Sequence, residues 1–428
     1  MKTYRLKLVA VLLVVLCVPA LAWADQTGDA STRVFESGGE LDEIDAQIEA
    51  TEYQEANRVL ESMIVGIEDR EHRYHPDLVR PLTLLGDALR GLGDAPGALD
   101  AYQRAIHVDR VNFGLYSPGQ VSIVYKEADT LRSVGDLQEA TKREEYAYEV
   151  LQKAFGVHGN QLLPGVYHLA DWYEKTYNIF AARALYEHAV RIYEANGQAG
   201  SLEMLPALRG LASTYRLERF PPFYVGDDSS AFAESSISST VDLKASHMRI
   251  NNFAAGEHAL QQVVRILSTQ PEPDSKALLQ GVLDLADWYM LFEKFSRALP
   301  LYTHAFELSE EIEDMDAVAY FAQPKMLHFP VPRDPNPPPI DNRGEELKGQ
   351  IEIGYAVSVR GAAIEMVTLV SEPEGLMDYK LRKSLRASRF RPALLDGEAI
   401  DISDQSHRLE FSYFEKKSDK TAPDADDI

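Results

Sequence analysis

The chain has 428 residues and a formal net charge of −24, from 67 acidic and 43 basic side chains. So acidic a chain is a poor electrostatic match for nucleic acid or anionic lipid, and we exclude both as partners. Its length exceeds what one hydrophobic core usually supports, so we expect two or more folding units.

Residues 1–24 are typical of a bacterial secretory signal peptide. Lys2, Arg5 and Lys7 precede an apolar run of 15 residues, and Ala22-Trp23-Ala24 matches a small-x-small cleavage site. We expect cleavage and a periplasmic protein. The alternative is an inner-membrane anchor, although the run is shorter than the ~20 residues that cross a bilayer as a helix.

An alanine recurs every 42 residues in the next part of the chain. Small residues precede three of these alanines by twelve positions, and apolar residues follow at four and seven positions, as on a buried helix face, with Glu144 as the exception. A fixed period of this size predicts stacked helical repeats with a shared binding surface. The repeating alanines are Ala56, Ala98, Ala140 and Ala182.

The repeats resemble the tetratricopeptide family, in which small residues sit where two helices cross and an aromatic follows. Gly86, Ala98, Tyr102 and Ala105 match that pattern, and Leu285-Ala286-Asp287-Trp288-Tyr289 has the same sequence as the earlier Leu169-Ala170-Asp171-Trp172-Tyr173. The resemblance implies about six helix hairpins within residues 36–320. It also implies that the repeats bind a partner protein or peptide.

The fifth repeat is interrupted. Its first helix is expected from Leu205 to Tyr215, but its second helix begins only after Asn251. The intervening residues 219–250 start with Phe220-Pro221-Pro222-Phe223-Tyr224 and are rich in serine, which predicts a loop. This loop is either a tolerated surface excursion or an aromatic plug over the concave groove.

In the tetratricopeptide family the first helix of each pair lines the concave face, which implies a partner-binding groove of mixed charge. The alternative is that Asp and Arg residues three positions apart simply pair along one helix surface. The candidate groove residues are Arg80, Asp87, Arg90, Tyr125, Asp129, Arg132, Tyr167, Asp171, Arg209, Arg216 and Asp287.

Residues 321–344 read as a proline-rich linker, with seven prolines between Pro324 and Pro339. A polyproline II stretch over residues 330–339 would separate its ends by roughly 30 Å at ~3.1 Å per residue. We therefore expect the module that follows to be held away from the repeats.

From Gln350 the apolar spacing changes to the alternation of a strand. We expect strands at 351–359 and 363–369, a helix at 376–388, and strands near Ile400 and at 409–413. The predicted fold is thus an all-α helical-repeat solenoid followed by a small α+β domain over residues 345–415. Residues 416–428 read as a disordered tail.

The strand-strand-helix-strand order resembles the C-terminal domain of TonB-type energy transducers. Gly361 at the hairpin, Ser371-Glu372-Pro373 before the helix, and Arg389-Phe390-Arg391-Pro392 and Asp396-Gly397 after it carry the resemblance. It implies a periplasmic domain that pairs a sheet edge with a short partner segment. The family's transducers keep a membrane helix, whereas this N terminus looks cleavable, so we expect docking rather than energy transduction.

The helix of this module carries a basic cluster in an otherwise acidic chain. The cluster is a solvated face opposite Leu381 and Leu385, or it docks on an acidic partner or on the protein's own acidic repeats. The candidate basic docking face consists of Lys380, Arg382, Lys383, Arg386 and Arg389.

No phosphate loop, dinucleotide fingerprint, zinc-protease motif or serine-hydrolase elbow occurs in the sequence. We expect no enzyme activity, cofactor or metal. The favoured function is a periplasmic scaffold whose repeats bind one partner and whose module docks on a second envelope component. The alternatives are a membrane-retained TonB-like component of envelope transport and an unrecognised enzyme.

Overall fold

The computed structural model describes residues 28–222, 252–336, 338 and 342–416. The predicted signal peptide, the inserted loop from residue 223 to 251 and the tail from residue 417 lie outside the described residues. The chain divides into two compact units, Met1–Asn112 and Phe113–Ile428. Each unit is described separately.

The first unit consists of two helix pairs. Its core joins apolar residues of α1, α2 and α3, among them Leu41, Ala56 and Leu84. Gly86 must be small, because a Cβ atom there would lie 2.3 Å from the ring of Tyr102. The elements are α1 (Gly28–Glu49), α2 (Tyr53–Arg70), the 3₁₀ turn η1 (Pro76–Leu78), α3 (Val79–Gly91) and α4 (Ala95–Phe113).

The second unit begins with four further helix pairs. The first helices α3, α5, α7 and α9 start 42 residues apart, each after a short 3₁₀ turn, so the predicted period is confirmed. The pairs are α5 (Val121–Ser133) with α6 (Leu137–Phe155), α7 (Leu163–Lys175) with α8 (Ile179–Ala195), α9 (Leu205–Arg219) with α12 (Phe253–Ser268), and α13 (Ser275–Leu291) with α14 (Phe295–Glu310). The turns are η2 (Pro118–Gln120), η3 (Asn160–Leu162) and η4 (Leu202–Met204).

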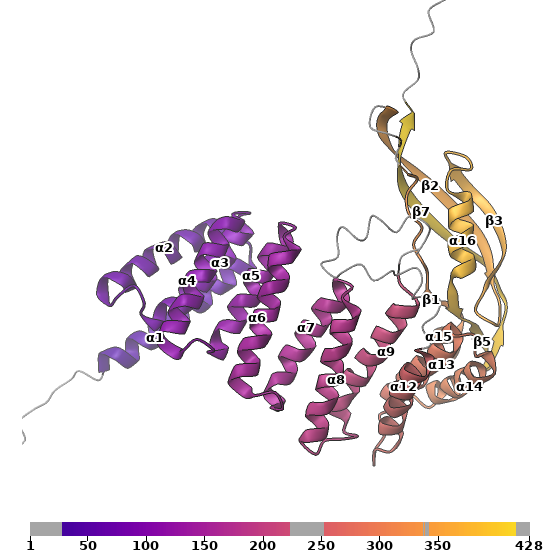
Figure 1. Ribbon diagram of the computed structural model, residues 1–428, viewed down its shortest axis with the longest axis horizontal. Coiled ribbons are helices and arrows are strands. Elements are labelled where there is room, and N and C mark those ends of the chain that lie inside the picture. The colour runs from indigo at the N-terminus through magenta and orange to yellow at the C-terminus, as the bar shows by residue number, and fades with distance from the viewer. Residues whose placement is uncertain (1–27, 223–251, 337, 339–341, 417–428) are drawn as a thin grey trace, which may run out of the picture. The chain divides into compact units, whose positions relative to one another are not determined.

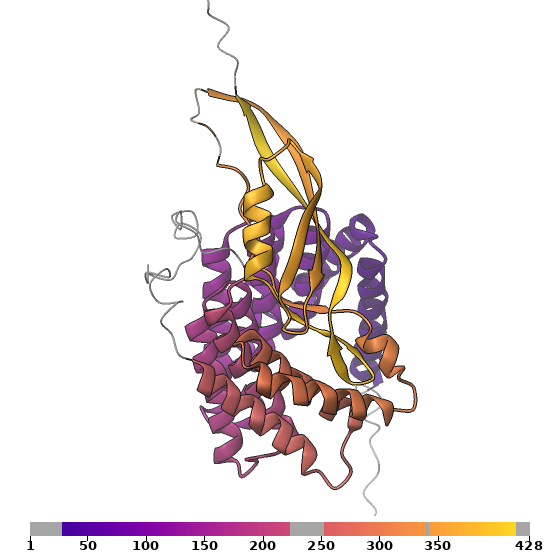
Figure 2. The same cartoon turned by 90° about the vertical axis from the view of Figure 1, so that its right-hand side faces the viewer.

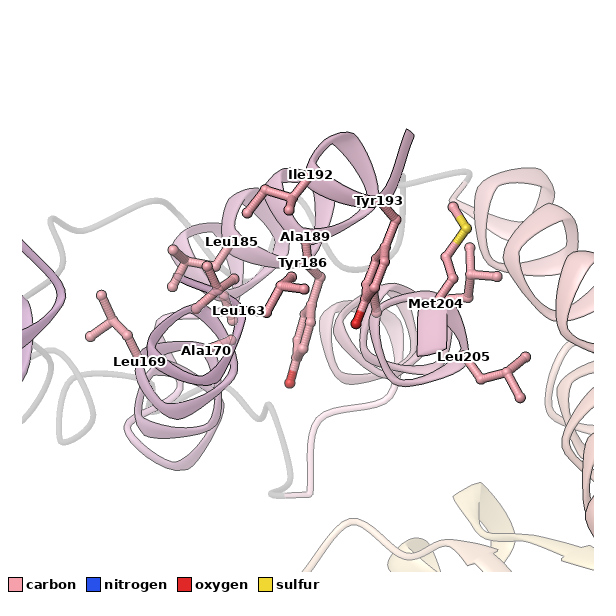
Figure 3. Packing of buried hydrophobic residues seen from close by; sticks show 14 of the residues in the cluster. Leu163, Leu169, Ala170, Leu185, Tyr186, Ala189, Ile192, Tyr193, Met204 and Leu205 are labelled. Carbon is pink, nitrogen blue, oxygen red and sulfur yellow. The ribbon is translucent and has the colours of Figure 1, made fainter. Parts of the chain in front are cut away.

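The repeating small and apolar residues form the core of these hairpins. Figure 3 shows α8 lying between neighbouring helices, with Leu185 near Leu163, and with Tyr193 near Met204 and Leu205. The repeating alanines Ala140 and Ala182 are fully buried. Glu144, the polar exception in the stripe, is buried as well, and its carboxylate lies 2.9 Å from His168 Nε2.

A three-stranded antiparallel sheet forms the C-terminal module. Its strand order is β3-β2-β7, with β2 (Arg343–Val357), β3 (Ala363–Glu372) and β7 (Ile402–Lys416). Helix α16 (Asp378–Ala387) lies along the sheet (Figures 1 and 2) and buries Leu381 and Leu385 against Ile351 and Ile353. The fold class is therefore confirmed as helix-hairpin repeats followed by a small α+β region.

Short strands outside this sheet form two further pairs, of which the sequence indicated only the strand near Ile400. The hairpin of β5 (Ala393–Leu395) and β6 (Glu398–Ile400) turns at Asp396-Gly397, where both residues have positive φ. Strand β4 (Arg389–Arg391) pairs antiparallel with β1 (Lys325–His328). Because β1 lies within the proline-rich segment, this pairing ties that segment to the module.

The expected separation of module and repeats is wrong. The short helix α15 (Ala317–Phe321) and β1 lead directly from α14 into the module. Leu327 packs with the apolar cluster of α13 and α14, and Phe329 packs with the core of the sheet. Burial of these side chains outweighs the extended preference of the flanking prolines. No helix in the described ranges is both long and apolar enough to cross a membrane.

Candidate functional site

The last helix pair anchors the C-terminal module through one carboxylate. Asp287 of α13 accepts a hydrogen bond from the Tyr302 hydroxyl of α14 at 2.8 Å. The same carboxylate accepts two hydrogen bonds from Arg391 of β4, from Nε at 3.0 Å and from Nη2 at 2.7 Å. The helix pair thus orients the Asp287 carboxylate, and the Arg391 guanidinium of the module binds it in a bidentate manner.

This ion pair is buried, since only 4% of Arg391 is exposed. Burial by itself lowers the pKa of Arg391, but hydrogen bonds from the guanidinium to Asp287 and the charge of Asp287 raise it overall. Burial, followed by the Asp287 charge, also raises the pKa of Tyr302. Removing one member of such a pair leaves the other charge buried and typically costs about 3–5 kcal/mol.

Further contacts join the module to the same hairpin. Arg389 of β4 pairs with Glu293 at the end of α13. The hydroxyl of Thr303 in α14 donates to the Gly397 carbonyl at 2.9 Å, and Leu394 of β5 is buried in the cluster of α13 and α14. Repeats and module are therefore packed together within the second unit.

A cavity of about 360 Å³ lies between the first helices of the last two pairs and strand β1. This volume is near the lower end of the roughly 300–1,000 Å³ typical of small-molecule pockets. The cavity brings together three of the predicted groove residues, Arg209, Arg216 and Asp287. The other lining residues are Ala212, Ser213, Leu260, Gln280, Asp284, Trp288, Leu291, Lys325, Met326 and Leu327.

Both carboxylates in the wall of this cavity are already held by cations. Asp284 accepts from Arg209 Nε at 3.3 Å and from Gln280 Nε2 at 2.6 Å. Burial raises the pKa of Asp284, although the Gln280 hydrogen bond and the Arg209 charge oppose this. Asp287 is bound by Arg391, which does not line the cavity. The Asp287 carboxylate therefore joins the last repeat to the module.

Two cations of the cavity have no such carboxylate. Within the described ranges, no acidic side chain lies within 4 Å of the charged groups of Arg216 or Lys325. Burial lowers the pKa of nearby His328 to about 4, helped by the positive charges of Arg216, Arg389 and Arg219. The cavity therefore carries an excess of positive charge in a strongly acidic chain.

The cavity wall also contains buried hydrogen-bond donors that lack partners. Trp288 is 2% exposed, and its indole Nε1 has no hydrogen-bond partner among the described residues. The same is true of Arg209 Nη2. Both atoms have almost no accessible surface, so they are unsatisfied donors buried behind the cavity wall.

The remaining groove candidates in the second unit are held by local contacts. Tyr125 stacks on His168 with ring centroids 3.7 Å apart, and the Tyr167 hydroxyl donates to that of Tyr193 at 3.3 Å. Asp129 pairs with Arg132 at 2.8 Å along α5. Asp171 pairs with Lys175 at 2.5 Å along α7. Asp129 therefore forms the Asp–Arg pair along one helix surface that was the alternative to a groove, whereas Asp171 pairs with a lysine four residues further on.

The candidates in the first unit behave similarly. Arg80 lies 2.5 Å from Asp42 of α1. Asp87 is buried and accepts from the Tyr102 hydroxyl at 2.8 Å, while Arg90 lies 3.8 Å away on the same helix. These three candidates are thus each in contact with a neighbouring side chain of the unit.

The predicted basic face of α16 is divided among several roles. Lys380 donates to the backbone carbonyls of Arg333 and Asp334, and Arg382 donates to the Met366 carbonyl of β3 at 2.8 Å. Lys383 lies over the ring of Tyr379. Arg386 lies in the last turn of the helix. Arg389, just beyond it, pairs with Glu293 and so contacts the protein's own repeats.

Sequence reasoning missed two charged residues of the cavity, Asp284 and Lys325. Asp284 lies three residues before Asp287, so the helical period could have placed both on one face of α13. No local signal indicates Lys325, because its strand is formed by pairing with β4. Among the described residues, no group of three His, Cys, Asp or Glu side chains could hold a metal ion.

No protein-family model and no curated protein sequence matches the chain. Solved structures that resemble it include TPR-like repeats from Podosopora anserina, at 16% identity over 56% of this chain and 99% of that one, with a TM-score of 0.39. BtubC from P. vanneervenii matches at 14% identity over 64% of this chain and 93% of its own, with a TM-score of 0.40. The apo form of RapI matches at 10% over 64% and 91%, with a TM-score of 0.33. The helix pairs themselves, with their 42-residue period, establish the TPR-like repeat fold.

Proposed function

We propose that the protein is an exported, non-enzymatic interaction protein of the bacterial envelope. Its repeats bind a protein partner, and its C-terminal module docks on a second envelope component. The observation that carries this proposal is the buried pair of Arg391 and Asp287, which joins the module to the last repeat. One packed body can then hold two partners at a fixed spacing.

The first helices α5 and α7 supply the surface for the first partner. Repeat folds expose such helices side by side, and this surface suits a protein or peptide. Arg132 and Lys175 are well exposed there, and their pairs with Asp129 and Asp171 are surface pairs that a partner can exchange at little cost.

The sheet of the C-terminal module supplies the second surface. Its β3-β2-β7 order with one covering helix fits the proposed likeness to the TonB C-terminal domain. We assign docking to the edge strand β3, where Val367 and Leu369 are 59% and 57% exposed. The other edge strand, β7, is contacted by the proline-rich segment, because Asp334 accepts from the Ser412 backbone amide at 3.1 Å. A partner segment would add to β3 through backbone hydrogen bonds.

Crosslinking in intact envelopes, followed by affinity capture, tests the repeat surface. Arg132→Glu combined with Lys175→Glu should remove one captured protein and keep the second. Lys142→Glu is the matched control, because it reverses an exposed charge on the second helix α6. Unchanged capture by the double variant would contradict this assignment.

A Val367→Lys, Leu369→Lys variant tests the sheet edge in the same way. It should lose the second partner and keep the first. Loss of both partners with an unchanged unfolding midpoint would contradict the division into two surfaces.

Export is tested by sequencing the N terminus of the mature protein. We expect a chain that begins at Asp25 and fractionates with the periplasm. An intact Met1 in the inner-membrane fraction would instead favour a membrane-retained component of envelope transport.

A further inference from the structure

We propose that the cavity between α9, α13 and β1 binds a small organic acid, that is, a carboxylate carried by an apolar group. This adds a small-molecule ligand to the two protein surfaces above. The proposal depends on the charge, the apolar wall and the shape of the cavity.

The charge of the cavity selects an anion. Asp284 is matched by Arg209, and Asp287 is matched by Arg391. Arg216 from α9 and Lys325 from β1 both line the space, and neither forms an ion pair within 4 Å with a described carboxylate, although the charge of Glu174 acts on Arg216 from a longer distance. The planar guanidinium of Arg216 can donate two parallel hydrogen bonds to a carboxylate, with Lys325 as a second positive charge.

The rest of the wall selects an apolar body. Leu260, Leu291 and Leu327 line the cavity, together with Met326 and the indole of Trp288. A ligand that places a hydrocarbon or aromatic group against these side chains gains apolar burial.

The shape selects a small molecule rather than an extended peptide. Strand β1 is held by β4 in the register Lys325↔Arg391 and Met326↔Phe390, and it forms one wall of the cavity. A peptide running across the first helices of the last two pairs would meet this strand. A ligand bound to both Arg216 and Lys325 would also bridge the repeats and the module, so its binding should strengthen their docking.

Titration of the full-length protein with phenylacetate tests the proposal, using calorimetry and tryptophan fluorescence as readouts. Phenylacetate should bind and change the Trp288 emission, and the response should persist in Trp172→Phe. Its neutral isostere phenylacetamide should bind at least about tenfold more weakly, because a hydrogen bond to a charged group is worth about 1.5–3 kcal/mol. Equal affinity for acid and amide would overturn the proposal.

Variants of the two unmatched cations locate the site. Arg216→Gln and Lys325→Gln should each weaken phenylacetate by about tenfold. Arg265→Gln, which removes an exposed charge of α12 that does not line the cavity, should not. Phenylacetate should also raise the unfolding midpoint of the wild type, but not that of the variant that combines Arg216→Gln with Lys325→Gln. Equal affinity of the wild type and the three single variants for phenylacetate would mean that phenylacetate binds outside this cavity.

Two other anionic ligands, inorganic phosphate and a peptide with a free C-terminal carboxylate, test which class of anion the cavity binds. Inorganic phosphate bound as tightly as phenylacetate would contradict the apolar half of the site. Binding only of peptides with a free C-terminal carboxylate would contradict the small-molecule assignment. Envelope capture through Arg132 and Lys175 uses other residues, so failure of phenylacetate binding with capture retained contradicts this inference alone.

Discussion

The second and the last helix pairs contain the same internal contact, yet only one of them anchors another part of the chain. In each, an aspartate of the first helix accepts from a tyrosine of the second at 2.8 Å, Asp87 from Tyr102 and Asp287 from Tyr302. Arg90 of its own helix lies 3.8 Å from Asp87, whereas Arg391 of β4 donates twice to Asp287. Each of the two repeats thus supplies an oriented carboxylate. Whether that carboxylate anchors the module depends on which arginine binds it.

Arg391→Ala should produce the largest difference between the two pairs. It leaves Asp287 buried without its counter-charge, so we expect a loss of about 3–5 kcal/mol in the free energy of unfolding. Faster amide hydrogen exchange in β1 and β4 should accompany the loss. Both are measurable on the full-length chain by urea unfolding and by mass spectrometry.

Arg90→Ala is the matched control in the second pair. Its guanidinium is partly exposed and 3.8 Å from Asp87, so we expect a loss below about 1 kcal/mol. Similar losses for the two variants would mean that the internal aspartate–tyrosine contact, rather than module docking, determines stability at both places.

Replacing the aspartates themselves sharpens the comparison. Asp287→Asn keeps an acceptor for Tyr302 but leaves Arg391 buried without its counter-charge, so it should cost about 3 kcal/mol, the low end of the range for a broken buried pair. Asp87→Asn should cost about 1 kcal/mol, because it weakens mainly one hydrogen bond. Thermal unfolding of the two variants measures the difference, and a larger loss for Asp87→Asn would contradict it.

The helix pairs could be predicted from the sequence, but the docking could not. The burial of Ala140 and Ala182 could be predicted, because a repeated position has the same surroundings in each copy. Arg391, by contrast, lies 104 residues from Asp287, and nothing near either residue indicates the other. The same limit applies to Lys325, whose strand exists only because β4 pairs with it. Within the proline-rich segment, the apolar residues Leu327 and Phe329 could have indicated that this segment packs against the repeats and the sheet.

Acid should lower the stability of the protein through His328 of β1. Its pKa is about 4 in the folded protein, mainly because of burial, against 6.5 ordinarily. Between pH 6.5 and 4 the unfolded chain therefore takes up a proton that the folded protein does not, and stability falls as pH falls. We expect about 2 kcal/mol at pH 5 relative to pH 7.5.

The contribution of His328 is measured as the difference between wild type and His328→Gln in unfolding midpoint across this range. The glutamine variant should lose less stability on acidification, whereas His72→Gln in the other unit serves as the control. Parallel pH profiles for wild type and His328→Gln would contradict the assignment.

Reversing charge at the rim of the docking contact should have the smallest effect. Glu293 is more than half exposed where it pairs with Arg389, so solvent screens the pair, and Arg389→Glu should cost only about 0.5–1 kcal/mol. Adding Glu293→Arg should restore most of the loss, because the pair is then re-formed in the opposite sense. A double-mutant cycle with urea unfolding gives the coupling energy directly. A coupling as large as the loss in Arg391→Ala would move the anchor of the module from the buried Asp287 to the exposed rim.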